Sequence, residues 1–145
     1  MKISQLLAAV LASAACFSAN AQTCPGGTTQ VNNLNPVSGN QICACRSGER
    51  WQEWHGPAGN LWDYKLGPGH PVDPTKIVGT WSVTNGANAL LTHTYGTTSY
   101  SFRVCRIGPV GSTSYTLVST TAGTVTPVTL LPASATPVGS CAPCP

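Results

Sequence analysis

Residues 76–107, KIVGTWSVTNGANALLTHTYGTTSYSFRVCRI, decide the fold class because apolar or aromatic side chains alternate with polar ones. A period of two is typical of a strand with one buried face. Three such strands are predicted, with inward faces formed by Ile77, Gly79, Trp81 and Val83, by Ala89, Leu91, His93 and Tyr95, and by Tyr100, Phe102 and Val104. Asn85-Gly86 predicts a type I′ hairpin turn, in which both residues take positive φ.

Two further short, β-branched segments follow, SYTLVST from residue 114 and TVTPVTLL from residue 124. Pro127 lacks an amide donor, which predicts a sheet edge for the last strand. Outside the first 21 residues, apolar residues do not recur at helical spacing over a helix length. The expected fold is all-β: a small antiparallel β-sandwich or barrel, disulfide-stabilised, with an irregular N-terminal arm.

The first 21 residues have the pattern of a cleaved secretory signal. Lys2 precedes an apolar run over residues 6–17, and small residues at Ala19 and Ala21 favour cleavage after Ala21. Lipid attachment at Cys16 is a competing interpretation. We therefore expect an exported protein that is periplasmic, secreted or attached to a bacterial cell surface.

The remaining 124 residues, 145 minus 21, suit a single domain. Within it we expect a Cys-clipped arm, an aromatic hairpin, a Pro-rich connection without a central strand, and a β-meander. Their predicted bounds are 22–46, 47–66, 67–76 and 77–145.

Six cysteines remain after removal of the signal, and an even number in a short exported chain predicts a disulfide framework. They are Cys24, Cys43, Cys45, Cys105, Cys141 and Cys144. Cys43 and Cys45 share one face of a strand and should take separate partners. Two alternatives are a zinc site built from CAC and CAPC, and thiol–disulfide exchange at CAPC. A zinc site needs reduced thiols, which an oxidising compartment does not maintain. An exchange site is activated by a helix N-terminus, and no helix pattern lies near CAPC. We therefore expect structural disulfides.

Charged residues are few: six Lys or Arg against four Asp or Glu once Lys2 is removed. No basic cluster could neutralise a run of phosphates, so nucleic acid is not an expected partner. The mature chain has no apolar segment of membrane-spanning length. Thr, Ser, Asn and Gly must cover most of the surface.

The chain lacks the sequence motifs of nucleophile elbows, phosphate loops, paired-histidine zinc sites and dinucleotide folds. Glu53 and Asp63 could lie on adjacent strands as a glycosidase-like pair, but we expect solvated carboxylates or partners of Arg50 and Lys65. The three histidines, His55, His70 and His93, are far apart in sequence, so we expect no three-histidine metal site. We therefore predict no cofactor and no metal, and lean against an enzyme.

The stretch RWQEWHGPAGNLWDYK, residues 50–65, holds three of the four tryptophans. If it forms a hairpin, Trp62 and Tyr64 share one face, and Trp51 shares the other with Glu53 and His55. Core packing explains most of these rings, while an exposed platform could stack on a sugar or a partner. Candidate ligand-binding residues are Trp51, Glu53, Trp54, His55, Trp62, Asp63 and Tyr64. Truncation to alanine should destabilise the fold at Trp62 and be tolerated at Trp51.

Two functions remain open from the sequence. One is a non-catalytic binding or surface-structural protein, with a glycan, another surface protein or a second copy as partner. The other is a carbohydrate-binding or carbohydrate-hydrolysing protein that uses residues 50–65.

Intact mass tests the disulfide prediction. The mass of residues 22–145 should lie six hydrogens below the reduced value, because three closed bonds remove two hydrogens each. Reduction should lower the melting temperature, since losing one native bridge costs about 2–5 kcal/mol in small exported domains. Free thiols, or zinc that survives purification, would contradict the prediction.

Overall fold

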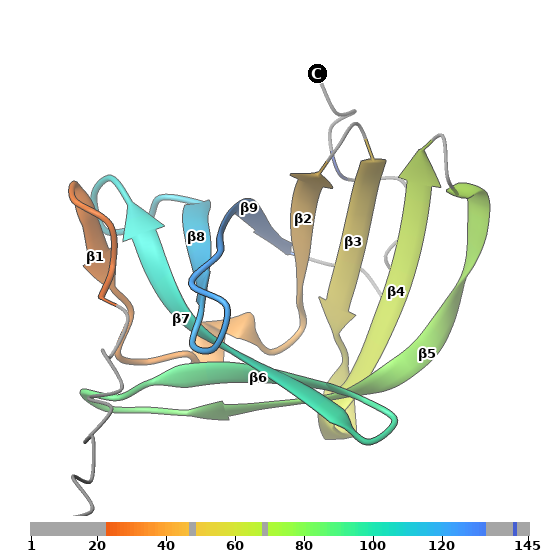
Figure 1. The fold of residues 1–145 in the computed structure, drawn as a ribbon, viewed down its shortest axis with the longest axis horizontal. Helices are drawn as coiled ribbons and strands as arrows, with labels where there is room; N and C mark the ends of the chain where they lie inside the picture. Colours follow the sequence, from red (N-terminus) through yellow and green to blue (C-terminus); the bar gives the residue numbers. More distant parts are fainter. Residues whose placement is uncertain (1–22, 47–48, 68–69, 133–140, 142–145) are drawn as a thin grey trace, which may run out of the picture.

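The structure is a computed structural model that describes residues 23–46, 49–67, 70–132 and 141. Nine strands and two 3₁₀ turns lie within these residues (Figure 1). They are β1 (Thr28–Gln30), η1 (Asn35–Val37), β2 (Asn40–Arg46), β3 (Glu49–His55), η2 (Pro57–Gly59), β4 (Asn60–Gly67), β5 (His70–Thr84), β6 (Leu90–Tyr95), β7 (Thr98–Ile107), β8 (Ser114–Ser119) and β9 (Val125–Pro132). In the part of the chain described, no helix is long and apolar enough to cross a bilayer.

Strands β2 to β9 form a closed antiparallel barrel in chain order. Each strand pairs with the next, and β9 pairs back with β2, where Ile42 lies opposite Leu130 and Ala44 opposite Val128. The short β1 is an extra strand that pairs with the end of β7. The all-β prediction is confirmed, and closure between β9 and β2 makes the fold a barrel and not a sandwich.

Apolar side chains fill one part of the barrel interior. Most come from inward-facing positions of β2, β6, β7, β8 and β9, and the others come from the segment around η1 and from the connection between β5 and β6. The buried cluster consists of Leu34, Val37, Ile42, Ala44, Ala89, Leu91, Val104, Leu117 and Val128. The void among these side chains is only about 10 Å³, so this part of the interior is packed.

Disulfides attach both ends of the domain to barrel strands. Cys24 is bonded to Cys105 on β7, and Cys43 on β2 is bonded to Cys141. Cys45 is disulfide-bonded as well, so Cys43 and Cys45 take separate partners as predicted. The predicted signal peptide and Cys144 lie outside the described residues.

The predicted type I′ turn at Asn85-Gly86 is wrong. Five residues, 85–89, connect β5 to β6, and of the two only Gly86 has a positive φ, at 98°. The Asn85 side chain has another use: its Oδ1 accepts a hydrogen bond from the Leu34 amide at 2.7 Å. Asn85 thereby fixes the N-terminal arm to the barrel end.

The prediction that the Pro-rich segment 67–76 is a connection is also wrong, because most of it belongs to a strand. Strand β5 begins at His70 and bends beneath the barrel (Figure 1). Pairing of β5 with β6 covers only Thr80–Thr84, whereas pairing with β4 reaches back to His70 through register shifts. Pro71 and Pro74 are tolerated because β4 is the only strand recorded beside this part of β5.

Two further predictions are wrong: that Ile77 faces inward, and that the last strand lies at a sheet edge. A register shift in the β4–β5 pairing places Gly79 opposite Leu61 but Ile77 opposite Trp62, so Ile77 lies on the outer face and is 52% exposed. A bulge reverses alternation in this way because it adds one residue to one strand. Strand β9 is not an edge strand, since it pairs on both sides; Pro127 lies just beyond the last residue paired with β2.

Gly79 is required where β5 approaches β6. A Cβ atom at Gly79 would overlap the main-chain carbonyl of Thr94, which cannot move without breaking the sheet. Gly79→Ala should therefore cost more than about 3 kcal/mol of unfolding free energy, at the upper end of overpacking effects. Urea denaturation of the oxidised protein measures this. Gly26→Ala, which meets nothing within 4 Å, should stay within about 0.5 kcal/mol, and equal losses would contradict the assignment.

Candidate functional site

A chain of polar side chains crosses the barrel interior beside the apolar cluster. Glu53 and His55 are two apart on β3, and His93 and Tyr95 are two apart on β6, so each pair projects from one face of its strand. Glu53, His55 and His93 are buried, with exposures of 6%, 0% and 1%. Buried polar groups require partners, and these four side chains provide them for one another.

The contacts form a continuous path. The Tyr95 hydroxyl donates to Glu53 Oε1, and Glu53 Oε2 lies 3.0 Å from His93 Nδ1. The Nε2 atoms of His93 and His55 are 2.9 Å apart. His55 Nδ1 lies 3.3 Å from the main-chain oxygen of Asn40 at the start of β2. The path therefore joins β6, β3 and β2 through the interior.

The contacts limit where the protons can lie. The Asn40 carbonyl only accepts, so His55 Nδ1 carries a hydrogen; carboxylate Glu53 only accepts, so His93 Nδ1 carries one too. A further hydrogen must lie between the two Nε2 atoms, because two lone pairs would repel. The lowered pKa of the buried His55 places this hydrogen on His93, whose ring then pairs as a cation with the Glu53 carboxylate.

Burial and the His93 charge lower the pKa of His55 from 6.5 to about 3, which keeps its imidazole neutral. Burial alone would raise the pKa of Glu53, but the charge and hydrogen bond of His93 and the Tyr95 hydroxyl outweigh it and lower that pKa. Burial and the neighbouring Glu53 carboxylate raise the pKa of Tyr95, so its hydroxyl stays protonated.

Aromatic rings enclose the two imidazoles. The Trp81 ring lies edge-on to His55 at 5.2 Å, and its Nε1 donates to the Gly56 carbonyl at 2.9 Å. The ring centroids of Phe102 and His93 are 5.6 Å apart, and those of Tyr95 and Tyr100 are 5.9 Å apart. These rings exclude water from the ion pair, which strengthens its electrostatics.

The carboxylates predicted on adjacent strands do lie opposite each other, Glu53 on β3 and Asp63 on β4. The expectation that they are solvated is wrong, because both face the interior and are buried, Asp63 with 5% exposure. The histidine pair is also brought together only by the fold.

Trp54 and Trp62 lie opposite each other on the outer face of β3 and β4, with ring centroids 6.0 Å apart. Trp54 is buried at 9% exposure, and Trp62 is half-buried. The register pairs Trp51 with Ala44 and Tyr64 with Gln52. The side chains of Trp51 and Tyr64 lie outside the described ones.

Sequence reasoning missed the link from His93 and Tyr95 to the β3 residues. The alternation of Leu91, His93 and Tyr95 indicated an inward face, but the partner strand across the barrel could not be inferred from it.

The side chain of His70, the third histidine, is outside the described part. Within the described residues, no group of three or more His, Cys, Asp or Glu side chains has the arrangement of a metal site.

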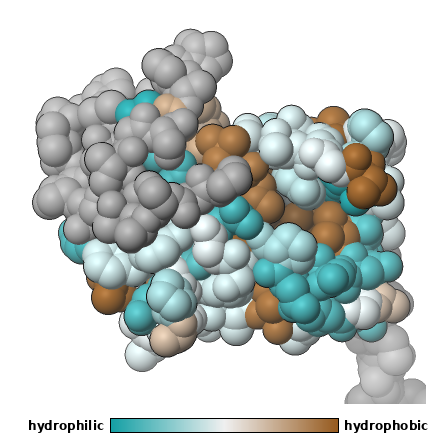
Figure 2. All heavy atoms as spheres, turned by 180° about the vertical axis from the view of Figure 1, so that it is seen from behind, coloured by the Kyte–Doolittle hydropathy of each residue, from teal (hydrophilic) through white to brown (hydrophobic). Residues whose placement is uncertain are grey.

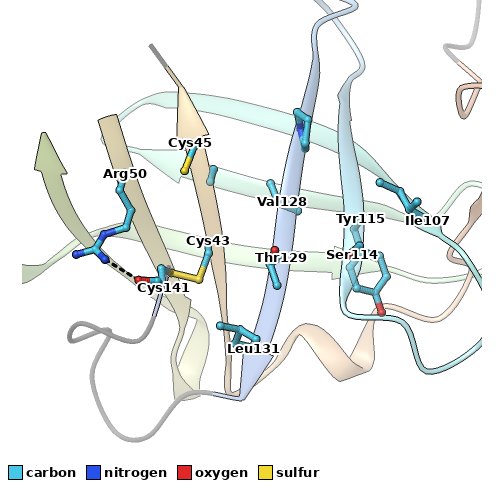
Figure 3. A pocket seen from close by; sticks show the side chains of 12 residues that line it. Cys43, Cys45, Arg50, Ile107, Ser114, Tyr115, Val128, Thr129, Leu131 and Cys141 are labelled. Atoms are coloured by element: carbon cyan, nitrogen blue, oxygen red, sulfur yellow. Dashed lines mark hydrogen bonds between the residues drawn. A yellow bond between two sulfur atoms is a disulfide. The ribbon is translucent and has the colours of Figure 1, made fainter. Parts of the chain in front are cut away.

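A second feature, not predicted, is a groove of about 670 Å³ across β2, β9 and β8 (Figure 3). Cys43, Thr129 and Ser114 are register partners on these strands and alternate with inward-facing residues, so the groove lies on the outer wall. The Cys43–Cys141 disulfide bounds one side, where Arg50 donates to the Cys141 carbonyl at 2.6 Å. Leu131 and Ile107 add apolar surface.

Comparison with known proteins yields no match to a family model, a curated protein or a solved structure.

Removal of the Glu53 charge tests the buried ion pair. Glu53→Gln leaves cationic His93 buried without its counter-charge, which should cost about 3–5 kcal/mol of unfolding free energy. Tyr95→Phe removes only one hydrogen bond to the carboxylate and should cost about 1.5–3 kcal/mol. Urea denaturation at pH 7 provides both values. A Glu53→Gln variant as stable as the native protein would rule out the charged assignment.

Proposed function

We propose that the protein acts after export as a non-catalytic binding or surface-structural module that makes its contacts through the outer wall of the barrel. The supporting observation is the contrast between interior and exterior. The interior void among the apolar residues is about 10 Å³, whereas the outer groove is about 670 Å³. Ligand sites commonly have volumes of about 300–1,000 Å³. A molecule of that size fits the groove and not the packed core.

The groove suits a partner with an apolar body and hydrogen-bonding groups. Its described lining combines aliphatic residues with Thr129, Ser114 and the Tyr115 side chain, and its only described charge is Arg50. Figure 2 shows hydrophobic side chains in separate clusters among hydrophilic ones on the far face, as expected of a surface rich in Thr, Ser and Asn. Such a surface favours specific contacts at limited places over general stickiness.

The contacts of Glu53 support a non-catalytic role. Both carboxylate oxygens are engaged, one by Tyr95 and the other by His93, and the pKa is lowered. A general acid needs a raised pKa and access to the substrate oxygen. Glu53 has neither property.

A carbohydrate-directed function is the second candidate. Trp62 is half-buried on the outer face, opposite the 52%-exposed Ile77 on β5. An accessible indole beside an apolar side chain can pack against the apolar face of a sugar ring. Because Trp54 is largely covered, this surface is smaller than the platform expected from the sequence.

Charge placed in the groove tests the proposal. Ile107→Lys adds a cation to an apolar groove residue that is 40% exposed, and should weaken self-association or ligand binding at least about 10-fold through desolvation of the ammonium. Native mass spectrometry over a concentration series measures assembly, and a glycan panel measures binding and turnover.

Val125→Lys is the matched control, because Val125 is also an exposed aliphatic strand residue, at 48%, and does not line the groove. It should leave assembly and binding unchanged. Equal effects of the two variants would contradict a groove-based function, and glycan turnover would contradict a non-catalytic one. Loss of glycan binding in Trp62→Ala alone would favour the second candidate.

A further inference from the structure

His55 connects three parts of one barrel end. Its Nε2 bonds to His93 on β6, its Nδ1 donates to the Asn40 carbonyl, and its own carbonyl accepts the Gly39 amide at 2.8 Å. Gly56, the next residue, is held by the Trp81 indole. The segment 39–40 and the β3–β4 turn are thus both attached through one buried side chain and its neighbour.

This link exists in only one protonation state of His55. The neutral imidazole presents a lone pair at Nε2 to the N–H of His93. Protonation of His55 at Nε2 would place two N–H groups, and two cationic rings, against each other across 2.9 Å. The hydrogen bond would then be replaced by repulsion in a region that excludes water.

The other titratable groups around the link are all identified. Glu53 on β3 pairs with His93, and Asp63 on β4 lies opposite Glu53 with Lys76 on β5 opposite Asp63. Tyr95 on β6 has a raised pKa and keeps its hydroxyl proton, and its ring contacts that of Tyr100 on β7. Burial and the charge of His93 lower the pKa of His55 by more than the Glu53 carboxylate raises it. Each carboxylate oxygen of Glu53 already has a partner, Tyr95 for Oε1 and His93 for Oε2.

We propose that His55 is an acid-sensitive latch: its protonation detaches residues 39–40 and the β3–β4 turn from the barrel end while the rest of the barrel stays closed. The disulfide between Cys43 and Cys141, just beyond this segment on β2, keeps the detached region tethered. Opening is therefore a local and reversible event.

The direction of the pH dependence follows from the two protonation equilibria. In the closed state the pKa of His55 is about 3, and in the open state it returns to about 6.5. The open state binds the proton more tightly, so the closed state is fully favoured above pH 6.5 and loses stability as pH falls toward 3. Between pH 7 and pH 5, the ratio of open to closed forms should rise about 20-fold.

Amide hydrogen exchange of the intact, oxidised protein tests this proposal. After correction for the intrinsic pH dependence, the Gly39 amide and the Trp81 indole N–H should show the 20-fold rise between pH 7 and pH 5. The Val31 amide, bonded to Val104 on the β1 side of the barrel, should not. An equal rise at Val31 would mean global unfolding and overturn the latch, as would no rise at Gly39.

A variant separates His55 from other acid-sensitive groups. His55→Gln is neutral at every pH, so opening at Gly39 should become independent of pH between 5 and 7; a retained 20-fold rise would overturn the proposal. If this variant does not fold, the ¹⁵N shifts of the native His55 ring give the answer. They should report a second proton only in the open form, and full protonation of His55 with Gly39 still protected would exclude the latch.

Discussion

Pairing between β9 and β2 is the constraint on which the rest of the structure depends. It joins Ile42 to Leu130 and Ala44 to Val128, and so closes eight strands into a barrel. Once the sheet is closed, every second side chain must fit a limited interior, and among the barrel strands the first part of β5 keeps an unpaired side in the recorded pairing. Bulges, Gly79 and the placement of Pro127 are local adjustments to this closure.

The interior is filled in two different ways. One part contains aliphatic residues from β2 and β6 to β9, and the other contains the ion pair and its histidine neighbour. A chain with few large apolar residues can complete a core with polar groups only if each has a partner. Here Glu53 and His93 neutralise each other, and Tyr95 and His55 occupy their remaining hydrogen-bonding positions. Such a core specifies its geometry more strictly than an aliphatic one.

Local patterns predicted the strands but not their associations. Alternation correctly indicated that Leu91, His93 and Val104 face inward, because no bulge interrupts the recorded pairing of Leu91 with Phe102 or His93 with Tyr100, although Tyr100 itself is 48% exposed. It failed at Ile77, where a register shift reverses the face. Closure could not be predicted, since Ile42 and Leu130 are remote in sequence. Glu53, Asp63 and His55 were recognised as candidates, whereas their shared interior position depends on that closure.

The Cys43–Cys141 disulfide also determines how the domain responds to mechanical force. A pull applied at Cys24 and Cys141 has a short covalent route: 19 residues of chain from Cys24 to Cys43, since 43 − 24 = 19, and then the bond to Cys141. Fully stretched, that route reaches only about 65 Å. Strands β3 to β9 lie outside it, so within the closed barrel only the first residues of β2 carry the load. The domain therefore resists extension as a short, covalently limited link, whatever the stability of its sheet.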